Sequence, residues 1–413
     1  MNLSSLRRGG FVATVATSLV AVIAVPAFAA VNFIVVTPSP NIGALHNELH
    51  AVAVGSSTVM FAVGESYNGT WDRALILQGN GTSWTASTAP QPPNATHNVL
   101  NSVTMAGATK GFAVGTYSLG RSSYNLIERF AANHWSRSSL SNPTGVTTSG
   151  LNGVAAGSAT SVMAVGGSHG TLQAMKPISA LFNGSIWKYY PVPNPGHIGT
   201  KSFTAELDGV SVVPGSLGKK FWAVGTYSNG SDTMPFFDMF NGLSWRQYKL
   251  IRSVQAVIAA PSPVSSVVSS VVVVAPNNAW AVGYYTANHT LPTPSNNRTF
   301  TAHWNGANWS MVVSPNRVSD STPNELVSVA ARSATKIYAV GRYFAGPYDQ
   351  TQVLMWNTAV LPPAWTKLTS GNNTIQHNSL EGIAVLPVKG AISVGAYYSG
   401  TADRTLIESC FDC

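Results

Sequence analysis

The sequence has few charged residues and no long basic stretch. Only 9% of its 413 residues are charged, with 23 Lys and Arg against 15 Asp and Glu. The basic residues are scattered, and Lys219-Lys220 is the only adjacent basic pair after the first thirty residues. Nucleic-acid recognition normally uses a basic stripe, and disordered chains combine low hydrophobicity with high net charge. We therefore expect a folded protein that does not bind nucleic acid.

Cysteine is almost absent. The only two, Cys410 and Cys413, stand near the C-terminal end. Because an exported protein meets an oxidising environment, this pair predicts a short structural disulfide. The C-x-x-C spacing also occurs in redox enzymes and zinc sites. The helix start that a redox site uses, and the two further ligands that a zinc site needs, are not evident here.

Apolar runs long enough to span a membrane are missing after the first thirty residues. Before that point, Arg7 and Arg8 precede an apolar run over Phe11–Val25, and an A-x-A sequence ends at position 29. This order is typical of a cleaved secretory signal. We expect residues 1–29 to be removed, and residues 30–413 to be secreted, extracellular or on the cell surface, without a transmembrane segment.

An internal repeat of about fifty residues organises the rest of the chain, and such a period is typical of repeat architectures. A sixteen-residue pattern opens with Leu or Val and ends with Gly. It occurs at Leu49–Gly64, Leu100–Gly115, Leu151–Gly166, Val268–Gly283, Leu326–Gly341 and Leu380–Gly395, and a longer copy covers Leu207–Gly225.

Each repeat contains four short runs that alternate apolar and polar residues and are rich in β-branched side chains, which predicts four strands. The turn before the fourth strand is usually Asn-Gly, as at Asn80-Gly81, and suits a tight hairpin. Four-stranded antiparallel units at this period are blades of a β-propeller. We therefore predict an all-β, seven-bladed β-propeller that forms a single domain over residues 30–413.

The seventh repeat is one strand short, because the chain ends soon after its third strand, Thr405–Cys410. At the other end of the chain, Ile34–Pro38 is similar to Met311–Pro315, the last strand of the fifth repeat. We predict that the N-terminal strand completes the last blade and closes the ring, which would pair an otherwise exposed edge. The alternative is an open arc of six and a half blades.

The blades, with their leading Leu, a W/F-A-V-G sequence and then W-N-G-x-x-W, resemble a broad group of secreted bacterial β-propeller repeat proteins, largely uncharacterised. The resemblance covers about residues 32–411. It implies the propeller fold. It carries no activity or cofactor that can be transferred residue by residue, and we predict no cofactor.

The loops after the second strands and between repeats are long and variable, and variable loops on a rigid scaffold tend to carry function. Two residues after the recurring Gly, five repeats place a tyrosine: Tyr117, Tyr227, Tyr285, Tyr343 and Tyr397. A ring of Tyr can stack on sugar faces and donate hydroxyl hydrogen bonds. The alternative is that these side chains pack between blades as a requirement of the fold.

Carboxylates recur just before the third strands, as Asp72, Asp232, Asp349 and Asp403, with Asn297 in the fifth repeat. They can bind Ca²⁺ or a polyol, or they can cap their own turns without any ligand. His46–His50 holds two His and one Glu, but a loop and strand start lack the helical spacing of a zinc motif, so it is a minor metal candidate. No carboxylate pair identifies a catalytic dyad, and we predict no catalytic residue.

These features predict a secreted, non-catalytic binding or scaffolding module that recognises glycans or protein partners through its variable-loop face. The alternatives are a structural or surface-layer component and a polysaccharide-acting enzyme. A cluster of acids at the mouth of the central channel would favour the enzyme. Extended strand contacts between molecules would favour the structural component.

Overall fold

The computed structural model describes residues 32–37, 39–251, 265–286, 297–318, 322–411 and 413. The predicted signal, residues 1–29, lies outside the described residues. The described residues form strands, turns and loops and no helix, which confirms the all-β class. Consequently no helix in this part of the chain is long and apolar enough to cross a membrane.

Strand formation follows the sequence repeats. The first strands are β2 (His46–Ser56), β6 (His97–Met105), β10 (Thr148–Ser158), β16 (Ala205–Val212), β21 (Ser265–Ala275), β25 (Asn324–Ser333) and β29 (Asn378–Val385). The second strands are β3 (Val59–Tyr67), β7 (Gly111–Leu119), β11 (Ser161–His169), β17 (Phe221–Ser228), β22 (Asn278–Thr286), β26 (Lys336–Ala345) and β30 (Ala391–Tyr398). Within each repeat, the first strand pairs antiparallel with the second.

The third and fourth strands continue each antiparallel meander outward. The third strands are β4 (Asp72–Gly79), β8 (Ser122–Ala131), β12 (Lys176–Phe182), β18 (Thr233–Phe240), β23 (Asn297–Trp304), β27 (Tyr348–Asn357) and β31 (Asp403–Cys410). The fourth strands are β5 (Trp84–Ser87), β9 (His134–Arg137), β13 (Trp187–Tyr190), β19 (Trp245–Tyr248), β24 (Trp309–Val312) and β28 (Ala364–Ser370). A short hairpin, β14 (His197–Ile198) with β15 (Lys201–Ser202), and β20 (Leu250–Ile251), parallel to β24, complete the strands.

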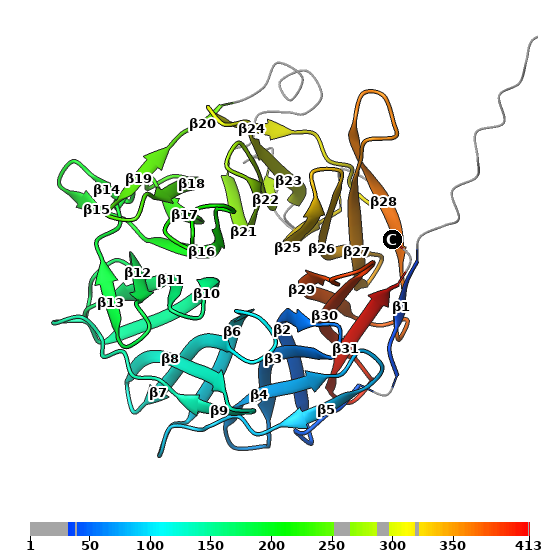
Figure 1. The fold of residues 1–413 in the computed structure, drawn as a ribbon, viewed down its shortest axis with the longest axis horizontal. Coiled ribbons are helices and arrows are strands. Elements are labelled where there is room, and N and C mark those ends of the chain that lie inside the picture. The colour runs from blue at the N-terminus through cyan, green and yellow to red at the C-terminus, as the bar shows by residue number, and fades with distance from the viewer. Residues whose placement is uncertain (1–31, 38, 252–264, 287–296, 319–321, 412) are drawn as a thin grey trace, which may run out of the picture. The chain divides into compact units, whose positions relative to one another are not determined.

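The N-terminal strand β1 (Asn32–Val35) occupies the position of a fourth strand beside β31 (Figure 1). It pairs antiparallel with β31, where Ile34 faces Ser409, and parallel with β28, where Phe33 faces Ser370. Phe33 is buried and meets the ring of Tyr338 edge-on, with centroids 6.4 Å apart. The first and last parts of the sequence therefore share one sheet, which is the pairing that the sequence predicted.

Within the described residues after position 31, the first strands of all repeats surround a common centre (Figure 1). Each contacts the first strand of the next repeat, from β2 through β25 to β29, and β29 contacts β2 again. The hydrophobic clusters lie between neighbouring repeats. Leu49 and Met60, for example, pack with Val394 and Ile407 of the seventh repeat. A repeat therefore completes its core only with its neighbours, as repeat architectures require.

Three carboxyl groups are buried inside this sheet structure, at equivalent third-strand positions: Glu128, Asp238 and Glu408. Ser370 Oγ donates to Glu408 Oε2 at 2.7 Å. Among the described residues, the oxygens of Glu128 and Asp238 have no hydrogen-bond partner. Burial raises the pKa of Glu128 and Glu408 to about 8 and that of Asp238 to about 7. Below about pH 7 all three side chains are therefore mainly protonated and neutral.

This burial predicts that stability falls as the pH rises. The pKa of Glu128 in the folded protein lies above its ordinary value of 4.5, so the folded state holds more protons. The free energy of unfolding therefore decreases from about pH 4.5 to about pH 8. Glu128→Gln should raise the melting temperature at pH 8.5 and change it little at pH 4, where the carboxyl group is protonated in both states. Thermal melts of both proteins at the two pH values test this, and an equal shift at both would contradict it.

Candidate functional site

Each first strand carries one residue that is bulged out of its antiparallel ladder, directly after the leading Leu or Val. In β2, for example, Leu49 pairs with Gly64 and Ala51 with Val63, so His50 is left without a cross-strand partner. The bulged residues are His50, Asn101, Asn152, Asp208, Ser269, Val327 and Glu381. A bulge re-aims its side chain away from the regular pleat.

The Gly that ends each sequence repeat accommodates this bulge. A Cβ atom on Gly64 would overlap the carbonyl oxygen of Glu48, far inside the 3.0 Å below which Cβ contacts essentially do not occur. The same overlap with the residue before the leading Leu or Val recurs in all seven copies. The recurring Gly is therefore required by close backbone approach, and the repeated motif encodes the bulge.

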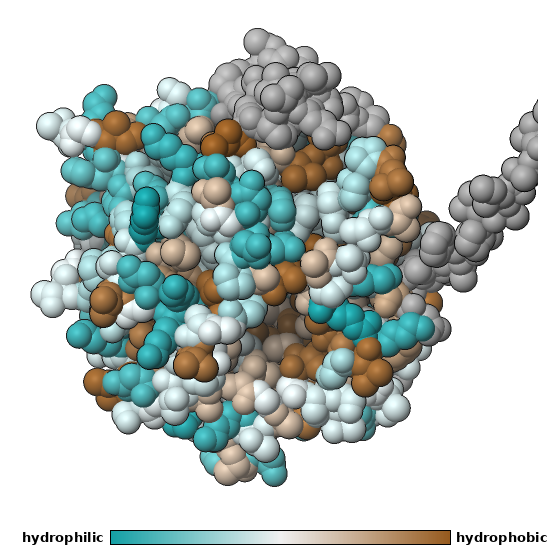
Figure 2. All heavy atoms as spheres, turned by 45° about the horizontal axis from the view of Figure 1, so that its top comes forward, coloured by the Kyte–Doolittle hydropathy of each residue, from teal (hydrophilic) through white to brown (hydrophobic). Residues whose placement is uncertain are grey.

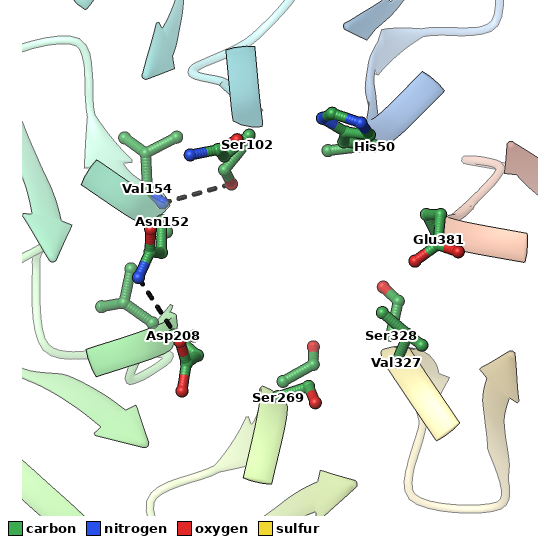
Figure 3. Close-up of a pocket in the computed structure, with 15 residues that line it drawn as sticks. His50, Ser102, Asn152, Val154, Asp208, Ser269, Val327, Ser328 and Glu381 are labelled. Atoms are coloured by element: carbon green, nitrogen blue, oxygen red, sulfur yellow. Dashed lines mark hydrogen bonds between the residues drawn. The ribbon is translucent and has the colours of Figure 1, made fainter. Parts of the chain in front are cut away.

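The bulged residues line a central cavity of about 250 Å³, together with the small residues that follow them. Figure 3 shows their side chains arranged around the open centre. Several reach the next repeat: His50 Nδ1 donates to Leu100 O at 3.2 Å, and Asn101 Nδ2 to Leu151 O at 3.0 Å. Asn152 Nδ2 donates to Leu207 O at 3.1 Å and to Asp208 Oδ1 at 3.4 Å. Burial raises the pKa of both acids in this ring, Asp208 and Glu381. The lining is polar.

Two further cavities are lined by residues of the first repeat, and the second of them also by residues of the sixth and seventh repeats. One, of about 310 Å³, is lined by His46, Glu48, Glu65, Tyr67 and Asp72. The other, of about 190 Å³, is lined by Glu48, Arg342, Asp349, His377, Asn378, Ser379, Glu381, Ala396, Tyr397, Tyr398 and Asp403. Glu48 lines both, and Glu381 also lines the central cavity.

We call this region, defined by Glu48, Glu65, Asp72, Asp349, Glu381 and Asp403, the acidic sector. The face in Figure 2 is hollowed near its middle.

Three of the four predicted Asp residues belong to this sector, and each is paired with a His of the following repeat. Asp403 Oδ2 lies 2.6 Å from His46 Nδ1, and Asp349 Oδ2 lies 3.3 Å from His377 Nδ1. Asp72 and His97 form the same pair. Asp232 lies in the fourth repeat, outside the sector. Asn297 Nδ2 donates to Glu325 Oε1 of the next repeat at 2.6 Å. The recurring carboxylates thus join neighbouring repeats.

Glu48, His50 and Glu65 form a compact group at the edge of the central cavity. One candidate ligand atom from each residue lies within 4.8 Å of the others. Hydrogen bonding to His50 lowers the pKa of Glu48, whereas burial raises that of Glu65. Burial alone would lower the pKa of His50, but the surrounding carboxylates outweigh it and the pKa is raised. In the described part of the chain, no other group of three such residues was found, and none of the four predicted Asp residues belongs to it.

The predicted tyrosines do not share one environment. Tyr285 is buried in a hydrophobic cluster. Tyr117 stacks on Tyr124 with centroids 5.3 Å apart, and Tyr227 packs edge-on against Phe236. Arg317 lies over the ring of Tyr343, 5.6 Å from its centroid. Tyr397 lines the smaller cavity of the acidic sector, together with Tyr398. Of the five predicted tyrosines, Tyr397 therefore lines one of the cavities described above.

The predicted disulfide between Cys410 and Cys413 is not formed. Both side chains are buried at the end of β31, in the cluster that contains Tyr338 and Phe33. Cys413 Sγ approaches Cys410 O at 3.6 Å, so the last residue folds back over the strand end. The two cysteines fill the core at this position, and the prediction from their spacing was wrong.

The minor metal candidate His46–His50 contributes Glu48 and His50 to the compact group, which Glu65 completes. Two signals in the sequence locate the other residues of the site. The bulged position is the variable, mostly polar residue directly after each leading Leu or Val. The His partners His46, His97 and His377 each stand three residues before a leading Leu. Each becomes recognisable only when it is compared with the Asp of the preceding repeat.

Comparisons with known proteins identify the fold class but no family. No protein-family model and no curated protein matches the sequence. Among solved structures, the chain is similar to polysaccharide lyase Uly1, with a TM-score of 0.53 and 11% identity over 91% of each chain. It is also similar to the β-propeller domain of the Trilobed protease from Pyrococcus furiosus, with a TM-score of 0.48 and 8% identity over 89% of this chain and 94% of that one. The C-terminal WD40 domain of Sif2 matches with a TM-score of 0.42 and 8% identity over 90% of this chain and 99% of that one. The similarity to Uly1 extends over nearly the whole of both chains and indicates a shared fold.

Proposed function

We propose that residues 30–413 form a seven-bladed β-propeller, closed by β1, which is exported after removal of residues 1–29 and acts as a glycan-binding module. Seven repeated meanders, the closed circuit of first-strand contacts and the pairing of β1 with β31 support the architecture. The N-terminal sequence pattern supports export. The acidic sector is the binding site in this proposal.

The observation that carries the function is a series of three cavities with shared lining residues: Glu48 lines both cavities of the acidic sector, and Glu381 lines one of them and the central cavity. Carboxylates, His and Arg342 supply hydrogen-bond acceptors and donors for sugar hydroxyls. Tyr397 and Tyr398 supply aromatic faces with polar ends. Ligand sites are typically concave, with a few convergent polar groups. Because the sector has more carboxylates than basic groups, it suits neutral or amino sugars better than acidic ones.

Glu48 and Glu65 are also relevant to the alternative of a polysaccharide-acting enzyme. A pair of acids at the mouth of the central channel would favour that alternative. Glycosidase carboxylates stand at least about 5 Å apart, because a bond or a water molecule must fit between them. The ligand atoms of Glu48 and Glu65 lie within 4.8 Å of each other. This limit is close to the separation of about 5–5.5 Å between the carboxyl groups of retaining glycosidases, so the enzyme is the alternative that the experiment below separates from binding. Polysaccharide lyase Uly1 shares the fold at 11% identity, which transfers no chemistry.

A glycan array probed with residues 30–413 tests the proposal. We expect retention of neutral or amino-sugar glycans, and a loss of at least about tenfold in affinity for Asp349→Asn, because one charged hydrogen-bond acceptor is removed. Asp232→Asn is the control, since Asp232 directly precedes the third strand of its repeat, one residue before the position equivalent to Asp349, and lies outside the sector. It should bind like the unmodified chain.

Three outcomes would reject the proposed function. The array can retain no glycan, the two Asn variants can bind equally, or incubation with the retained polysaccharide can release new chain ends. The last outcome would establish the enzyme alternative.

A further inference from the structure

The first repeat contains a pair of like charges that other repeats avoid. Glu48 precedes the leading Leu and faces Glu65 across the ladder between β2 and β3. In the sixth repeat the equivalent positions hold Glu325 and Arg342, whose Nη2 lies 2.8 Å from Glu325 Oε2. The other five repeats place at most one carboxylate at this pair of positions. Like charges directly opposite in a sheet are destabilising, so Glu48 and Glu65 need a positive charge beside them.

His50 is aimed at these two carboxylates. Its Nδ1 lies 3.2 Å from Leu100 O. A carbonyl oxygen can only accept, so Nδ1 carries the hydrogen. The other ring nitrogen, Nε2, lies 3.9 Å from Glu48 Oε2. A His that donates one ring N–H to a backbone carbonyl and presents the other nitrogen to carboxylates has the arrangement usual for metal-ligating His.

We propose that Glu48, His50 and Glu65 bind one divalent transition-metal cation, such as Zn²⁺ or Mn²⁺. In the first repeat this cation supplies the positive charge that Arg342 supplies in the sixth. One imidazole nitrogen and two carboxylate oxygens form a donor set suited to these ions, whereas Ca²⁺ prefers oxygen ligands throughout.

The geometry allows the ion to enter and bind. The side chains of His50 and Glu48 are 24% and 42% exposed, so the group is accessible. Ligand bonds of about 2.0–2.2 Å place neighbouring donor atoms roughly 3–3.5 Å apart. The present separations are within 4.8 Å, so binding requires side-chain rotations that bring the donor atoms closer by roughly 1–2 Å.

The test is titration calorimetry of tag-free residues 30–413 with ZnCl₂ and with MnCl₂. We expect one saturable site per chain for at least one of the two ions. His50→Ala should weaken binding at least about tenfold. Glu65→Arg should abolish it while the chain remains folded, because this change recreates the Glu–Arg pair of the sixth repeat. The control is His134→Ala, which removes an exposed imidazole in β9 and should bind like the unmodified chain.

Absence of saturable binding at millimolar concentrations, or equal binding by His50→Ala and the unmodified chain, would overturn the proposal. If Glu65→Arg fails to fold, Glu65→Gln replaces it and should bind at least about tenfold more weakly. Binding of the metal salt alone is measured, so the result does not depend on whether the protein recognises glycans.

Discussion

Replacing Gly115 by Ala should unfold the protein or destabilise it severely. The added Cβ would overlap Val99 O, a backbone atom that is fixed by the bulge at Asn101. This overlap can be relieved only if the bulge moves. That movement would also disturb the ladder between β6 and β7 and the packing of the buried residue Leu100. We expect a loss of at least about 3 kcal/mol in the free energy of unfolding, at the upper end for overpacked cores. Urea denaturation followed by tryptophan fluorescence measures it.

Gly120→Ala serves as the control for this change. Gly120 has φ +61° and no atom within 4 Å of its missing Cβ, so only left-handed backbone strain opposes the substitution. That strain costs about 1 kcal/mol. Equal effects of the two substitutions would contradict the view that the recurring Gly exists to admit the bulge.

Removing β1 should have a comparably large effect. Deletion of residues 30–37 exposes the edge of β31, which Ile34 and Val35 now cover. It also removes Phe33 from the cluster that contains Tyr338 and Leu406. An exposed edge strand pairs with other chains, so the truncated protein should melt at a sharply lower temperature and aggregate.

Single substitutions separate the packing of β1 from its backbone pairing. Phe33→Ala should cost about 3–5 kcal/mol, as is usual for a buried Phe. Ile34→Ala in the same strand should change stability little, because Ile34 is 56% exposed. Differential scanning calorimetry compares the unmodified chain with the truncated chain and the two substituted chains. A truncated chain that melts like the full one would show that β1 does not stabilise the structure.

The fold is largely predictable from the sequence because its causes are local and repeated. The leading Leu, the recurring Gly and the Asn-Gly turn before the fourth strand specify the same meander in successive repeats. Gly81, for instance, has φ +95°, and Asn80 Oδ1 accepts hydrogen bonds from the backbone N–H groups of Thr82 and Ser83. The pairing of β1 with β31 was predicted from the similarity of Ile34–Pro38 to Met311–Pro315, but the register was wrong by one residue. Ile34 faces Ser409, which makes it equivalent to Ser310 and not to Met311.

The candidate site was much less predictable, because it joins residues that differ between repeats. Periodicity pointed to the tyrosines, yet Tyr285 is in the core and Tyr117 packs on a neighbouring ring. The residues that distinguish the acidic sector break the repeat: Glu65 replaces the Arg of another repeat, and His50 and Glu381 occupy a variable bulged position. Their proximity depends on which repeats are neighbours around the centre. The predicted disulfide was wrong because the C-x-x-C spacing does not distinguish a disulfide from two thiols buried in the core.

The most direct test of the glycan-binding proposal is a calorimetric titration with a glycan retained on the array, comparing Tyr397→Ala with Tyr117→Ala. Both residues hold the same position in their repeats, but Tyr397 lines the acidic sector and Tyr117 stacks on Tyr124. Measured below both melting temperatures, Tyr397→Ala should weaken binding at least about tenfold, as expected for the loss of one stacking ring. Tyr117→Ala should leave affinity unchanged and lower only the melting temperature. Loss of binding in Tyr117→Ala with normal affinity in Tyr397→Ala would contradict a site in the acidic sector.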